Sequence, residues 1–84
     1  MSSLVGFARM FLSDLQVKEK AVVQGFQGES LLQERLMELG VVPGTTLLLK
    51  RFAPLGDPME IIVRGYSLSI RKEDAKQIRV ERLS

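Results

Sequence analysis

Cysteine, histidine and tryptophan are all missing from this 84-residue chain. Without cysteine the chain can form no disulfide framework and no thiolate metal site. Without histidine it lacks the commonest general base and the commonest ligand of transition metals. Any metal ion would have to be held by carboxylates, methionine sulfur or backbone oxygens. These absences favour a binding module over an enzyme, and we expect neither a cofactor nor a resident metal site.

The chain also has little excess of positive over negative charge. The chain has 12 lysines and arginines against 10 carboxylates, a net charge of +2, and no block of like charges. Nucleic-acid binding usually requires a basic patch or stripe, so this pattern argues against it. The apolar run near the start is interrupted by Arg9 and is much shorter than the ~20 residues that span a bilayer. It also lacks the features of a signal peptide, and we therefore expect a cytoplasmic protein.

A chain of this length supports a single domain. Apolar residues recur at helical spacing between positions 4 and 12, which indicates a short N-terminal helix. We divide the chain into this apolar lead-in, residues 1–12, and a domain formed by residues 13–84.

The clearest helix is expected at about residues 30–39. Ser30 and Gln33 match a capping box, in which two side chains satisfy free amides at the helix start. Gly40 stands where a helix ends in the left-handed conformation. Three leucines form the expected buried stripe: Leu32, Leu36 and Leu39.

About five short strands are expected around this helix, which predicts a mainly β fold in the form of a small barrel. The strands are expected at residues 21–26, 45–53, 59–63, 66–71 and 78–81. Leu47 and Leu49 share one face of the second strand and Phe52 is out of step with them, which indicates a bulge near residues 50–51. Arg64 and Gly65 are expected to form a tight hairpin turn.

The unusual element is the loop at residues 53–58, with the sequence Ala-Pro-Leu-Gly-Asp-Pro. Two prolines and a glycine stiffen it, and Asp57 can fix a turn by binding backbone amides. Leu55 has no evident role in the core. A preorganised loop that exposes an apolar side chain loses little entropy on binding, so we expect a partner contact here. The candidate contact residues are Arg51, Phe52, Pro54, Leu55, Met59 and Arg64.

Three segments carry a resemblance to a known family. Residues 35–44 (RLMELGVVPG), 53–58 (APLGDP) and 64–75 (RGYSLSIRKEDA) resemble the FeoA family of ferrous iron transport in their order and spacing. The resemblance covers about residues 13–81 and implies an SH3-like barrel with an inserted helix. It also implies a small cytoplasmic protein that acts with FeoB, a membrane transporter with a cytoplasmic GTPase domain, so that any membrane contact comes through this partner. Family members often have glycine where this chain has Lys18, in the turn before the first strand.

Two other functions stay open at this point. Phe52, Tyr66, Arg51 and Arg64 could form a stacking surface for single-stranded nucleic acid, although rings in the core and solvated arginines are the simpler explanation. A similar domain closes iron-dependent repressors of the diphtheria-toxin-repressor type, so a metal-sensing domain is a further alternative. No helix-turn-helix precedes the barrel here, which argues against a repressor. The sequence leaves open whether a transition metal binds directly and whether the chain forms a weak homo-oligomer.

Overall fold

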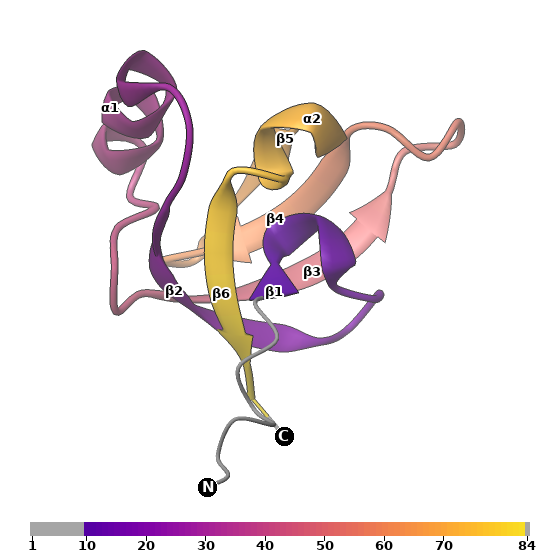
Figure 1. The fold of residues 1–84 in the computed structure, drawn as a ribbon. Coiled ribbons are helices and arrows are strands. Elements are labelled where there is room, and N and C mark those ends of the chain that lie inside the picture. The colour runs from indigo at the N-terminus through magenta and orange to yellow at the C-terminus, as the bar shows by residue number, and fades with distance from the viewer. Residues whose placement is uncertain (1–9, 84) are drawn as a thin grey trace, which may run out of the picture.

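The computed structural model describes residues 10–83, which form one curled antiparallel sheet of six strands (Figure 1). Its strand order is β1-β6-β2-β3-β4-β5. The elements in chain order are β1 (Met10–Phe11), the 3-10 turn η2 (Leu12–Asp14), β2 (Lys20–Phe26), α1 (Ser30–Glu38), β3 (Thr46–Phe52), β4 (Met59–Val63), β5 (Tyr66–Ile70), α2 (Lys72–Ala75) and β6 (Ile78–Arg82). The expected mainly β fold with one inserted helix is confirmed. It has six strands where about five were predicted, and the sheet is not closed, because β1 and β5 are its two edges.

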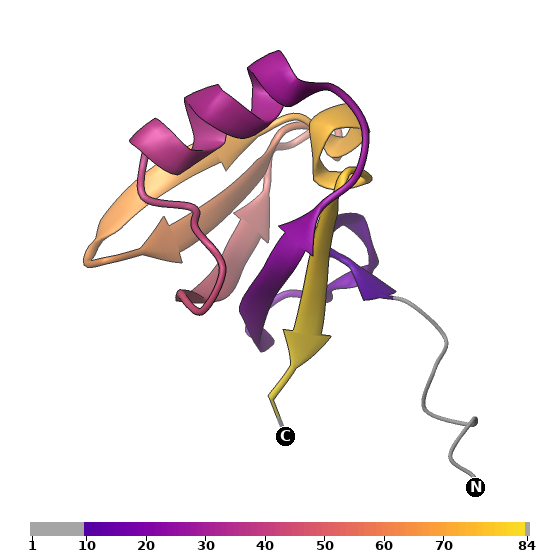
Figure 2. The same cartoon turned by 60° about the vertical axis from the view of Figure 1, so that its left-hand side comes forward.

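One hydrophobic core lies on the inner face of this sheet. Along β4, Met59, Ile61 and Val63 are fully buried and alternate with partly exposed residues, the period-2 pattern of a strand with one buried face. Both helices add to the same core, α1 through Leu32 and α2 through Ala75. Figure 2 shows α1 lying across the strands, with α2 near the beginning of β6.

Helix α1 differs from the sequence prediction at both ends. Its N-cap is Glu29 and no side chain caps it, so the capping box assigned to Ser30 is wrong. The amide of Glu29 instead donates to Oε1 of Gln77 at 3.0 Å, a partner 48 residues away that no local pattern indicates. Leu39 is 43% exposed rather than buried, because the helix has already ended and the chain turns at Gly40 with φ 98°.

The predicted N-terminal helix over residues 1–12 lies mostly outside the described residues. Met10 and Phe11 are not helical, since they form β1 and pair with β6, Met10 opposite Val80, and Leu12 begins the 3-10 turn η2. Leu12 belongs to the buried core. β1 and Leu12 therefore pack against the domain expected for residues 13–84.

The predicted bulge and hairpin are confirmed. The register of β3 with β4 shifts between Leu49 and Arg51, and Phe52 consequently packs against the core. Arg64 and Gly65 have φ of 53° and 87°. Two successive left-handed residues give the two-residue turn whose twist matches that of the flanking strands.

Candidate functional site

The 53–58 loop joins β3 to β4 and is closed by its own backbone. The amide of Ala53 donates to the carbonyl of Pro58 at 2.9 Å, and the amide of Gly56 donates to the carbonyl of Ala53 at 2.7 Å. Gly56 has φ 90°, a conformation that glycine adopts without steric cost. The peptide bond between Asp57 and Pro58 is cis. The two hydrogen bonds make the loop a compact turn that projects from the end of the sheet (Figure 1).

Asp57 fastens this loop to α2. The amide of Lys72 donates to Oδ1 of Asp57 at 3.0 Å, and Lys72 is the first residue of α2. The carboxylate therefore satisfies a backbone amide that has no acceptor within the helix, the task that a capping side chain performs. The sequence predicted that Asp57 would bind backbone amides, but the amide that it binds lies in another element.

The side chain of Lys72 returns to the base of the same loop. Its Nζ lies 4.8 Å from the centroid of the Phe52 ring, within the range of a cation–π contact. Beside it, Asp57, Pro58 and Arg71 line an open hollow of about 380 Å³. Sequence reasoning missed Arg71 and Lys72 as part of this site, because only the pairing of β4 with β5 brings residue 72 close to residue 52.

Leu55 stands at the tip of the loop and is 96% exposed. The loop beneath it is held by hydrogen bonds at Ala53, Gly56 and Asp57. The hydrogen bonds hold the loop in one conformation, so Leu55 projects from the surface in a fixed position.

The structure brings together some of the expected contact residues and separates others. Phe52, Pro54 and Leu55 lie at the loop. Met59 is 0% exposed in the core, so it cannot belong to an exposed surface, and its place among the contact residues is corrected. Arg64 directly follows the end of β4 that is remote from the loop. Five strand residues at ~3.4 Å each separate Arg64 from the loop by roughly 17 Å, so Arg64 is not part of the surface around Leu55.

Arg51 points away from the core beside Glu60, and Nε of Arg51 lies 2.8 Å from Oε1 of Glu60. The same geometry weakens the nucleic-acid hypothesis. Phe52 is opposite Met59 at one end of β4, whereas Tyr66 follows the turn at the other end. The two rings therefore do not form one stacking surface.

Among residues 10–83, no three carboxylates gather in a group that could hold a metal ion. Within the same range, no helix combines the length and the apolar character needed to cross a bilayer.

Comparison with known proteins agrees with this fold. The family model described as FeoA domain matches residues 10–82. A Fe(2+) transport protein A/Fe(2+) transporter FeoB fusion protein of Porphyromonas gingivalis is 37% identical over 75 residues, which cover 89% of this chain and 9% of the fusion protein. The chain thus corresponds to a small part of that relative.

Two solved structures extend the comparison. The solution structure of FeoA from Chlorobium tepidum is 41% identical with a TM-score of 0.84, over 89% of this chain and 71% of that one. A zinc complex of FeoA from Stenotrophomonas maltophilia is 30% identical with a TM-score of 0.75, over 86% and 89% of the two chains. The latter is described as an SH3 domain protein, which confirms the expected SH3-like architecture. With one family model covering nearly all described residues, the chain belongs to the FeoA family of ferrous iron transport.

Proposed function

We propose that this chain is a cytoplasmic, non-catalytic accessory protein of ferrous iron uptake. It acts by direct contact with the GTPase-containing cytoplasmic part of a FeoB-type transporter, and it touches the membrane only through that partner. The Porphyromonas gingivalis relative joins the two proteins in one chain. Such a linkage holds two domains at high effective concentration, which supports a contact between them.

The observation that carries the proposal is the exposure of Leu55 on a fixed loop. Full burial of a leucine side chain contributes ~1.5–3 kcal/mol. A loop that is already ordered loses little further entropy when its tip enters a pocket. Leu55 is therefore proposed as the anchor, with Pro54 beside it. The contact of Lys72 with the Phe52 ring stabilises the base of the loop.

The test is Leu55→Asp, with Met37→Asp on α1 as a control that adds the same charge at another exposed apolar position. Calorimetric titration with the purified cytoplasmic part of the FeoB-type transporter from the same organism measures the affinity. We expect Leu55→Asp to bind at least ~10-fold more weakly, a loss of ~1.4 kcal/mol, while the control binds like the wild type. Leu55→Asp keeps the wild-type melting temperature, because this side chain is 96% exposed. Met37→Asp melts somewhat lower, because a negative charge in the last turn of a helix is unfavourable, but it stays folded at the temperature of the titration.

The outcomes separate the two parts of the proposal. If the wild type does not bind the transporter, the proposed function is wrong. If the wild type binds and Leu55→Asp binds equally well, the function stands and the assignment of the loop is wrong. Ferrous iron uptake by cells carrying each variant gives the corresponding result in vivo.

A further inference from the structure

Three aliphatic side chains lie together on the outer face of the sheet. Val22, Leu48 and Ile62 are each partly exposed, and each stands between two buried residues of its strand, so they point away from the core. Leu48 is directly opposite Ile62, and Val22 is opposite Thr46, two residues from Leu48. None of the three packs against the core. They form an apolar strip across β2, β3 and β4, in which Val22 and Leu48 are diagonal neighbours, and we call it the outer strip.

Two lysines border the outer strip. Lys20 is directly opposite Leu48, and Lys50 follows Leu48 by two residues in β3. Both side chains are exposed. Within residues 10–83 neither lysine forms an ion pair, so both positive charges are available to a molecule that covers the strip.

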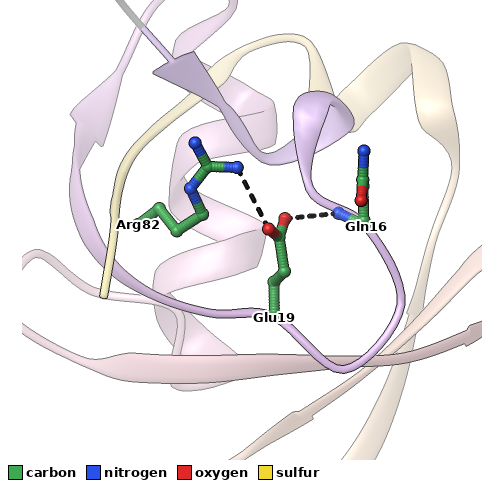
Figure 3. A network of polar contacts seen from close by, with 3 residues as sticks. All are labelled: Gln16, Glu19 and Arg82. Atoms are coloured by element: carbon green, nitrogen blue, oxygen red, sulfur yellow. Dashed lines mark hydrogen bonds and ion pairs between the residues drawn. The ribbon is translucent and has the colours of Figure 1, made fainter. Parts of the chain in front are cut away.

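Two of the three carboxylates near the outer strip form ion pairs, and the third, Glu81, accepts a hydrogen bond from a neutral amide. The pairs are Glu19 with Arg82 (3.0 Å), Glu60 with Arg51 (2.8 Å) and Glu81 with Gln24 (3.2 Å). Figure 3 shows that the carboxylate of Glu19 also accepts from the backbone amide of Gln16, at 2.8 Å. Glu81 lies opposite Val22 and keeps its charge, because Gln24 is neutral. With Lys20 and Lys50 unpaired, the border of the outer strip still carries more positive than negative charge, which fits an apolar partner surface that carries carboxylates.

The outward face of α1 has this complementary chemistry. Leu31 is 74% exposed, and Glu34 and Glu38 follow at i+3 and i+7, which places all three in one stripe on the side away from buried Leu32. Neither glutamate has a side-chain partner among residues 10–83. Arg35, the one cation of the helix, lies beside this stripe.

The spacing of the charges on the two faces is compatible. Lys20 and Lys50 lie on adjacent strands and are offset by two residues, which separates their backbones by roughly 8 Å. Glu34 and Glu38 are one helical turn apart, roughly 6 Å. Long, exposed side chains readily span this difference, and Leu31 then lies over the outer strip.

We propose that copies of this chain associate head to tail, with the outward face of α1 in one copy packed on the outer strip of the next. The two faces of this contact differ, so it is heterologous and builds a ring or an open chain rather than a two-fold dimer. It shares no residue with the 53–58 loop and leaves that loop free. Because its ion pairs are exposed, the association is weak and is screened by salt.

Sedimentation equilibrium at ~1 mM protein and low salt tests the proposal. The wild type is expected to show an average mass that rises with concentration and falls towards the monomer at ~0.5 M salt, where the screening length is only a few ångströms. Glu34→Lys/Glu38→Lys and Lys20→Glu/Lys50→Glu should each remain monomeric. Combining all four reversals in one chain should restore the association, because the charges match again.

The matched control is Glu73→Lys/Asp74→Lys on α2, which changes the net charge by the same amount as the α1 double reversal and lies outside both faces. It should associate like the wild type. The proposal is overturned by a wild type that stays monomeric, by a fourfold variant that fails to recover while circular dichroism shows it folded, or by a control that associates as poorly as the α1 reversal. None of these results bears on binding to the transporter.

Discussion

The hydrogen bond between the Asp57 carboxylate and the amide of Lys72 fastens the 53–58 loop to α2. Asp57→Ala removes it and leaves the first amide of α2 without its acceptor. Replacing a capping carboxylate by alanine costs ~1 kcal/mol, within a range of ~0.5–2. In a domain of this size each kcal/mol lowers the melting temperature by ~4–8 °C. We therefore expect Asp57→Ala to melt ~4–8 °C below the wild type.

Asp57→Asn and Glu73→Ala are the controls that distinguish loss of this hydrogen bond from loss of a carboxylate. Asparagine keeps an oxygen acceptor at the same place without the charge, so it should retain much of the stability. Glu73 also lies in the first turn of α2, and its side chain makes no hydrogen bond among the described residues. Thermal unfolding followed by circular dichroism should rank Asp57→Ala clearly below both. Equal melting of Asp57→Ala and Glu73→Ala would show that the hydrogen bond contributes nothing.

The same variant connects stability to binding. Once detached from α2, the 53–58 loop must be ordered when the partner binds, and immobilising a flexible side chain costs ~0.5–1.5 kcal/mol. Titration with the cytoplasmic part of the FeoB-type transporter should therefore show a ~3- to 10-fold weaker affinity, although Leu55 is unchanged. A variant that melts early but binds with wild-type affinity would show that preorganisation of the loop is not required.

Two further predictions concern left-handed backbone positions. Gly44 has φ 94° and nothing within 4 Å of an added Cβ, so Gly44→Ala should lower the free energy of unfolding by ~1 kcal/mol through backbone conformation alone. Gly40 has φ 98°, and Gly40→Ala should lower it further, because the added Cβ would lie 3.2 Å from Oη of Tyr66. Urea denaturation measures both, and equal losses would mean that the side chains of Tyr66 and of Arg64, whose Cδ also lies 3.2 Å from the added Cβ, move aside at no cost. Lys18 also has a left-handed φ of 75°, so Lys18→Gly should stabilise the fold by ~0.5 kcal/mol, the relief of strain less the added entropy of the unfolded chain. A lower urea midpoint for Lys18→Gly would refute this explanation.

The parts of the fold that sequence reasoning predicted are those determined by neighbouring residues. The bulge followed from Phe52 being out of phase with Leu47 and Leu49, and the hairpin followed from the glycine at position 65. Met59 was wrongly counted among the contact residues because it directly follows the loop, although the strand expected at residues 59–63 already included it. The alternation of Met59 with Ile61 and Val63 was a signal in the sequence that could have placed it in the core.

The site itself was only partly predictable, because its main contacts join distant segments. Asp57 and Lys72 are separated by 15 residues, and they meet only because β5 folds back along β4. Outside the site, the amide of Glu29 at the start of α1 likewise finds its partner 48 residues away, in Gln77. In both cases a side chain satisfies a backbone amide at the start of a helix, a task that local capping rules assign to a neighbouring residue.

Leu55, which we propose as the anchor, is thus separate from the contacts that hold the 53–58 loop. The core of the described residues holds no buried polar or charged side chain. The geometry of the 53–58 loop is set by contacts at the base of the loop: two backbone hydrogen bonds, the Asp57 carboxylate and the cation–π contact of Lys72 with Phe52. Leu55 takes part in none of them. Substitutions at residue 55 should therefore change binding to the partner without changing the stability of the fold. Substitutions at Asp57 should lower both the stability and the affinity for the partner. Comparing the two positions separates the residue that contacts the partner from the residues that hold the loop in place.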